Sequence, residues 1–102
     1  MSIDAVSRAD FDRFEPFRHP DADTFFEEAE WFADSDGIVI GILTRDRRDD
    51  DWAFVVLGRD EQGTFRAFEN EAAIALRDEA RAQLLAAMRR ALSSGVKIFP
   101  QD

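Results

Sequence analysis

The chain has 102 residues, 45% of them hydrophobic and 12% aromatic, and a formal net charge of -9. This length is typical of one domain, and the apolar content excludes a disordered chain. Because binding to phosphates or to acidic lipids needs clustered Lys and Arg, the charge argues against direct nucleic-acid binding and membrane binding and favours a basic protein partner.

The absence of Cys excludes a disulfide framework, a thiolate metal site and a cysteine nucleophile. The segment Met1–Arg13 has no apolar run typical of a signal peptide, and no stretch approaches the roughly 20 apolar residues of a membrane span. We therefore expect a cytoplasmic protein. Lys97 is the single Lys, and this bias towards Arg suggests a bacterial genome of high GC content.

The N-terminal arm, residues 1–26, is rich in Phe. Phe11, Phe14 and Phe17 recur at every third position, and proline interrupts any longer regular element. This pattern predicts a short turn of helix followed by an extended arm.

The sheet is expected within residues 27–69, because short β-branched and aromatic runs alternate there with turn residues. Strand-like runs occupy 25–34, 38–45, 52–59 and 64–68. Asp36-Gly37 and Gly63 suit the two hairpin turns, since glycine adopts positive φ without steric cost. Gly41, inside the second strand, indicates a bulge or a close backbone approach.

The C-terminal helix is predicted over residues 70–94, with Asn70 as its N-cap and Gly95 as its stop signal. Its inward stripe is expected to contain the following residues: Ile74 or Ala73, Leu76, Ala80, Leu84, Met88 and Ala91. A tail, 95–102, follows. The fold predicted is thus a single α+β domain: a four-stranded antiparallel meander with an N-terminal Phe-rich arm and one long C-terminal helix packed on one face.

The stretch from Glu30-Trp31-Phe32 to Arg59 resembles short uncharacterised bacterial proteins of β-β-β-β-α build. The resemblance covers about half of the chain, implies no activity and transfers no site residue.

The second and third strands are apolar on both sides, so both faces of the sheet need a cover. We assign one face Ile38, Ile40, Ile42, Trp52, Phe54 and Val56, and the other Val39, Leu43, Ala53, Val55 and Leu57. The helix covers one face only, and four large exposed side chains on the other would forgo on the order of 6 to 12 kcal/mol. The Phe-rich arm, a second copy of the chain, or both together supply the second layer, and we expect a homodimer.

Two acidic clusters have a metal-binding interpretation and a plainer one. Asp34-x-Asp36-Gly37 resembles the start of an EF-hand loop, but the hydrophobic run that follows favours a hairpin turn. The aspartates of 46–51 are of the type that binds Mg²⁺ or Ca²⁺, yet interleaved arginines can neutralise them. We expect the second cluster to be a solvated, self-paired loop.

No motif predicts catalysis, a cofactor or a metal site. His19 is the single histidine, no serine lies in a Gly-x-Ser-x-Gly elbow, and no glycine-rich phosphate loop is present. Arg66 would support a pocket only if it faced the helix, paired with Asp78 or Glu79.

The candidate interaction surface combines the spaced phenylalanines, for which core packing is the alternative, with the charged loop. Its residues are Phe11, Phe14, Phe17, Arg45, Asp46, Arg47, Arg48, Asp49, Asp50 and Asp51. The favoured function is a small non-enzymatic protein-interaction or regulatory module that self-associates. The alternative is a small-ligand binder or enzyme with a pocket between helix and sheet, which would need convergent polar groups there.

Overall fold

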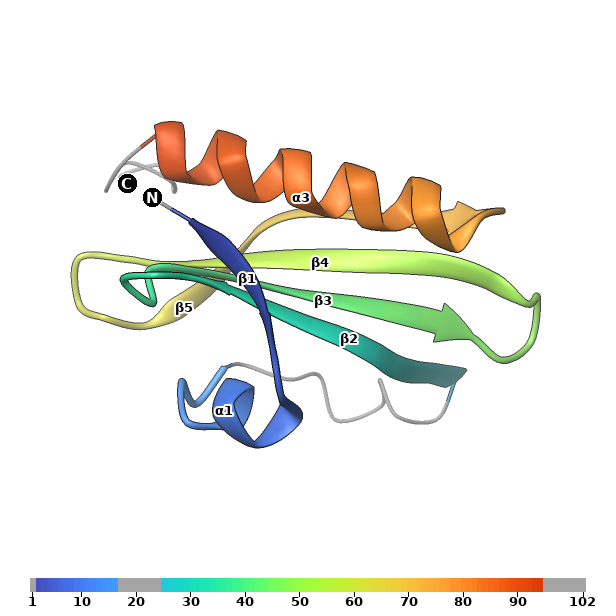
Figure 1. The fold of residues 1–102 in the computed structure, drawn as a ribbon, viewed down its shortest axis with the longest axis horizontal. Helices are drawn as coiled ribbons and strands as arrows, with labels where there is room; N and C mark the ends of the chain where they lie inside the picture. Colours follow the sequence, from blue (N-terminus) through green and yellow to red (C-terminus); the bar gives the residue numbers. More distant parts are fainter. Residues whose placement is uncertain (1, 17–24, 95–102) are drawn as a thin grey trace.

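The computed structural model of the chain describes residues 2–16 and 25–94. It is an α+β fold with one antiparallel sheet, in which each strand pairs with the next along the chain (Figure 1). The strands are β1 (Ile3–Val6), β2 (Phe26–Asp34), β3 (Val39–Asp46), β4 (Asp51–Arg59) and β5 (Phe65–Ile74). Helix α3 (Arg77–Ser93) lies on one face and the short helix α1 (Arg8–Asp12) on the other. Within the described residues, no helix is long and apolar enough to cross a membrane.

The sheet has five strands, so the prediction of four was wrong. The additional strand is β1, which pairs antiparallel with β2 from Ile3 opposite Asp34 to Val6 opposite Trp31. Four residues are too few to reveal a period of two, and this strand is held by a partner far along the chain. For this reason the local sequence predicted an irregular arm at the position of β1.

The C-terminal helix begins at Arg77, so the predicted start at Asn70 was also wrong. Asn70 lies in β5 opposite Val55, and the strand continues to Ile74. Register shifts show that β5 carries an extra residue at two places, near Phe68 and near Ala73. Two such bulges destroy the alternation that marks a strand, and Ala and Glu have high helix propensity, so pairing with β4 overrides the local preference.

The helix face of the sheet holds the larger core. Side chains of β2 to β5 pack against α3 in a cluster of Phe32, Val39, Leu43, Phe54, Val56, Ile74, Ala80, Leu84, Ala87, Met88 and Ala91. Gly41 lies directly beneath the helix: a Cβ there would come within 3.0 Å of the Met88 sulfur and 3.1 Å of Leu84 Cδ2. The glycine therefore allows the close backbone approach that the sequence indicated.

Salt bridges connect α3 to strands on both sides of this core. Glu30 of β2 accepts from Arg77 Nη2 at 3.0 Å and lies 3.4 Å from Arg81 Nε. On the other side, Arg90 Nη2 donates to Glu69 of β5 at 2.5 Å. These pairs fix the helix along the sheet, although exposed ion pairs contribute little individually.

The opposite face is covered by the arm. Phe11 of α1 is fully buried and forms a second cluster with Ala33, Ile40, Ile42, Leu57 and Phe65. The ring of Phe14 meets that of Phe65 edge-on at 6.3 Å, and a Cβ on Gly37 would lie 2.9 Å from the Phe14 ring. Of the two covers considered, the arm supplies this layer within a single chain, so a second copy is not needed to bury these residues.

The assignment of side chains to faces was partly wrong, because it grouped Ile40 and Ile42 with Phe54 and Val56. Ile42 lies opposite Val55, and Leu43 lies opposite Phe54. Directly opposed residues share a face, so the length of the β3–β4 turn sets which residues of the two strands group together.

Candidate functional site

The described part of the chain holds no group of three or more His, Cys, Asp or Glu side chains that could bind a metal ion. In the same residues, every buried side-chain nitrogen or oxygen has a hydrogen-bond partner. The space between α3 and the sheet is occupied by the apolar cluster already described. His19 and Phe17 lie outside the described residues.

Asp34 is a structural carboxylate and has the turn role that the sequence favoured. Its side chain is buried, and Oδ1 accepts hydrogen bonds from the backbone N–H groups of Ile38 and Val39, both at 2.7 Å. Oδ2 accepts a third bond from the N–H of Asp36 at 3.0 Å. Gly37 has φ 68°, as expected of this turn.

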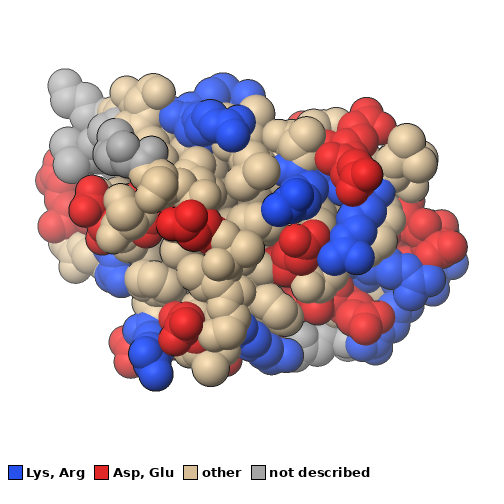
Figure 2. All heavy atoms as spheres, viewed as in Figure 1, with Lys and Arg blue, Asp and Glu red and all other residues tan. Residues whose placement is uncertain are grey.

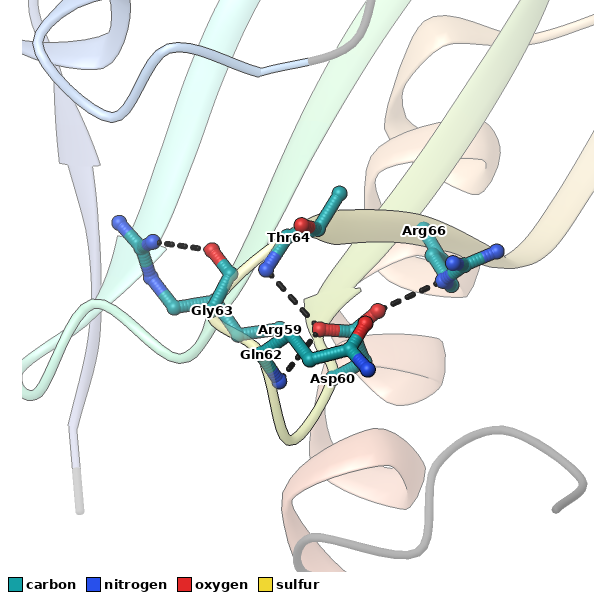
Figure 3. A network of polar contacts seen from close by, with 6 residues as sticks. All are labelled: Arg59, Asp60, Gln62, Gly63, Thr64 and Arg66. Carbon is teal, nitrogen blue, oxygen red and sulfur yellow. Dashed lines mark hydrogen bonds and ion pairs between the residues drawn. The ribbon is translucent and has the colours of Figure 1, made fainter.

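Asp60 organises the β4–β5 turn in a similar way (Figure 3). Oδ1 accepts from the N–H groups of Gln62 at 2.9 Å and Thr64 at 3.0 Å, and Oδ2 accepts from Arg66 Nε at 2.7 Å. Arg66 is exposed and pairs here rather than with an acid of α3, so it gives no support to a pocket. The hydrogen bond from Arg66, followed by that from the Thr64 N–H, lowers the pKa of Asp60.

Replacing Asp60 by Asn is expected to destabilise the protein in a pH-dependent way. The pKa of Asp60 is lower in the folded state than its ordinary value of 3.8. The ionised side chain therefore stabilises the fold fully above pH 3.8, and this stabilisation is lost as the pH falls through the folded-state pKa. Urea unfolding of both proteins should give a difference at neutral pH that shrinks below pH 3.8. Arg66→Gln should show the same convergence, and a difference that persists in acid would contradict this account.

The candidate loop is a tight four-residue turn between Asp46 and Asp51, which are directly opposed in the sheet. The guanidinium of Arg45 donates to Asp50, with Nε at 2.8 Å. Asp46 is buried and accepts from the Arg48 N–H at 2.8 Å and from Arg48 Nη2 at 3.1 Å. The side-chain and backbone hydrogen bonds from Arg48 lower the pKa of Asp46. Protein cations therefore neutralise these carboxylates.

One side of this turn is tied to the beginning of β2. The N–H of Arg47 donates to the carbonyl of Phe25 at 2.8 Å. The Arg48 guanidinium lies over the Phe25 ring at 4.1 Å. Phe25 nevertheless remains 40% exposed, so an aromatic ring is held at the surface by a cation–π contact.

On the other side lies the junction between β5 and α3, which breaks two local rules. Ala73 has φ 59°, a left-handed conformation that is unfavourable for residues with a Cβ. Leu76 occupies the N-cap of α3, where it provides no side-chain hydrogen bond, and is 65% exposed. Leucine is among the poorest N-cap residues. The next residue, Arg77, places its guanidinium 5.2 Å from the Trp52 ring.

These elements meet at one end of the sheet, which we call the turn end: Phe25, residues 45–52 and residues 74–77. In Figure 1 it lies at the right, where the β3–β4 turn and the start of α3 come together. Figure 2, in the same view, shows acidic and basic side chains interspersed there. Phe25 and Leu76 are the large hydrophobic residues exposed in the part of the chain that the structure describes, and both belong to the turn end.

The structure thus separates the predicted interaction residues into two groups. Phe11 is fully buried and Phe14 is half-buried, so both pack on the sheet, which was the alternative considered for them. The seven loop residues stay together at the turn end. Sequence reasoning missed Phe25 and Leu76; the acidic pair Asp78-Glu79, typical of a first helical turn, was the signal that could have placed Leu76 at an N-cap.

Comparison with protein families, with curated proteins and with solved structures found no match for this chain.

Proposed function

We propose that the protein is a small non-enzymatic interaction module that self-associates through the turn end. The observation that carries this proposal is Leu76, an exposed leucine at a helix N-cap. Glu79 stands at the third helical position, so a serine at 76 would complete a capping box. Leucine at this position lowers the stability of the isolated chain, which supports a contact outside the chain as the reason for it.

Binding is favoured over catalysis by the way the polar clusters are used. Asp34, Asp46 and Asp60 direct their oxygens to backbone N–H groups or arginines of their own turns. An enzyme or ligand binder would need convergent polar groups aimed into a cavity. The lack of Cys supports a reducing compartment, and we propose that the module acts in the cytoplasm.

Leu76→Ser is expected to raise the free energy of unfolding by about 0.5 to 1 kcal/mol while weakening self-association. The serine cap accounts for the gain in stability, which is partly offset by the loss of the apolar contacts that the buried part of Leu76 makes. Unfolding should be measured in dilute, monomeric protein, because association itself stabilises the folded state. Sedimentation equilibrium over a concentration series measures the association.

Two further variants separate the effects. Leu76→Ala should weaken association without the gain in stability, and Ala82→Ser, on the exposed surface of α3, should leave association unchanged. Wild-type protein that stays at 11.6 kDa up to millimolar concentration would disprove self-association. A Leu76→Ser variant that associates as tightly as the wild type would remove Leu76 from the contact.

A further inference from the structure

We infer that the partner of the turn end is the turn end of a second copy, joined by a two-fold axis with the charged turns facing each other. This inference rests on the proposed function and specifies the geometry of the contact. A two-fold contact sets one patch against an identical patch, so the patch must complement itself. Three properties of the turn end meet that condition.

The first property is charge balance. The turn end contains four arginines and four aspartates, and these are Arg45, Arg47, Arg48, Arg77, Asp46, Asp49, Asp50 and Asp51. The whole chain carries -9, so the net negative charge lies entirely elsewhere. Two copies that approach through most other surfaces repel each other, whereas approach through the turn end brings neutral patches together.

The second property is that both signs of charge stand exposed on the same turn. Arg47 and Asp49 are both exposed and lie two residues apart in this turn. Asp50 adopts φ 56° and bonds through its N–H to the carbonyl of Asp46 at 2.9 Å, which fixes the backbone of the turn. In a two-fold contact, the arginine side of one rigid turn meets the aspartate side of the other.

The third property is size. The molecule measures 36 × 29 × 26 Å, and β2 to β5 and α3 run along its longest dimension (Figure 1). The end of the molecule therefore measures at most 29 × 26 Å across, so the area that it can bury does not exceed the roughly 800 Å² that each partner contributes to a standard interface. Phe25 and Leu76, at either side of the turn, supply the apolar part. A contact that buries only part of this end is smaller than a standard interface, which fits a dissociation constant in the micromolar range.

Charge reversal at the turn tests this geometry because a contact between identical patches predicts weaker association for both signs of change, whereas net charge alone predicts weaker association for Arg47→Glu and tighter association for Asp49→Arg. Arg47→Glu makes the whole chain more negative and gives the turn end a negative patch; Asp49→Arg makes the chain less negative and gives it a positive patch. If identical patches meet, each variant repels itself and its self-association should weaken at least tenfold at low salt. An equimolar mixture should recover association as mixed dimers.

The matched controls are Asp36→Arg and Arg13→Glu, which change the net charge equally but lie away from the turn end. They should alter the dissociation constant far less than tenfold, in the direction that net charge dictates. Sedimentation equilibrium of each variant and of the mixture, with one copy fluorescently labelled, gives the dissociation constants. Circular dichroism of each variant verifies that it is folded.

The outcomes distinguish this inference from the proposed function. If Asp49→Arg tightens association and the mixture shows no preference for mixed dimers, the two copies meet elsewhere and the inference is wrong, even when Leu76→Ser still dissociates the protein. If the wild type remains monomeric at every concentration, the proposed function fails, and a basic protein becomes the partner to seek by its attraction to the acidic surface.

Discussion

Replacing Phe11 by Ala is expected to lower the free energy of unfolding by about 3 to 5 kcal/mol. Phe11 is fully buried, and it is the residue through which the five-residue helix α1 enters the second core cluster. So short a helix has no stability of its own, so α1 keeps its position by tertiary packing alone. Urea unfolding measures the loss, which is a large share of the about 5 to 15 kcal/mol typical of a domain.

A matched control for this substitution is Phe25→Ala, which removes the same side chain from a 40% exposed site. It should cost no more than about 1 kcal/mol, mainly the cation–π contact with Arg48. Equal losses for the two variants would mean that the arm is not part of the cooperative core.

Asp34→Ala is expected to destabilise the protein by on the order of 3 kcal/mol. The substitution leaves the N–H groups of Ile38 and Val39 without the carboxylate that accepts both of them at 2.7 Å. Hydrogen bonds to a charged acceptor contribute about 1.5 to 3 kcal/mol each, and a buried donor left unpaired loses its hydration as well. Thermal and urea unfolding should both report the change.

Asp34→Asn provides the control, because its amide oxygen can still accept from Ile38 and Val39. It should retain much of the stability, while Asp36→Ala, at an exposed position of the same turn, should have little effect. If Asp34→Ala and Asp36→Ala cost the same, the three hydrogen bonds to Asp34 would not be what holds this hairpin.

The parts of the fold that sequence predicts well are those with strong local signals. The β-branched runs of β3 and β4, the glycines of both hairpins and the end of α3 near Ser93 agree with the prediction. In each case the residue preference and the tertiary environment favour the same structure. The left-handed conformations of Gly37 and Gly63 illustrate this agreement, with φ of 68° and 81°.

The rest depends on pairing that a local window does not contain. β1 is recognisable only through its pairing with β2. In β5, two bulges interrupt the alternation of polar and apolar residues that marks a strand. The grouping of Ile40 and Ile42 by face required the register across the β3–β4 turn. Errors of this kind shift side chains from one face to the other without changing the number of predicted residues in a strand.

About half of the candidate site could be predicted from the sequence. The charged turn was identified from its alternating arginines and aspartates, and the structure shows how Arg45 pairs with Asp50 and Arg48 with Asp46. Leu76 was assigned to the inward stripe because the helix start was placed too early. Its exposure became evident only once β5 was seen to extend to Ile74.

We expect the two bulges of β5 to limit aggregation at high concentration. β5 is a ten-residue strand at the edge of the sheet, and its outer backbone groups have no further strand beside them in the described structure. A long regular edge is a template for intermolecular strand addition and fibril growth. The extra residues near Phe68 and Ala73 interrupt the regular spacing of the outer N–H and C=O groups, so a regular strand cannot pair along the whole edge. The bulges that made β5 hard to recognise in the sequence therefore also protect this edge from polymerisation.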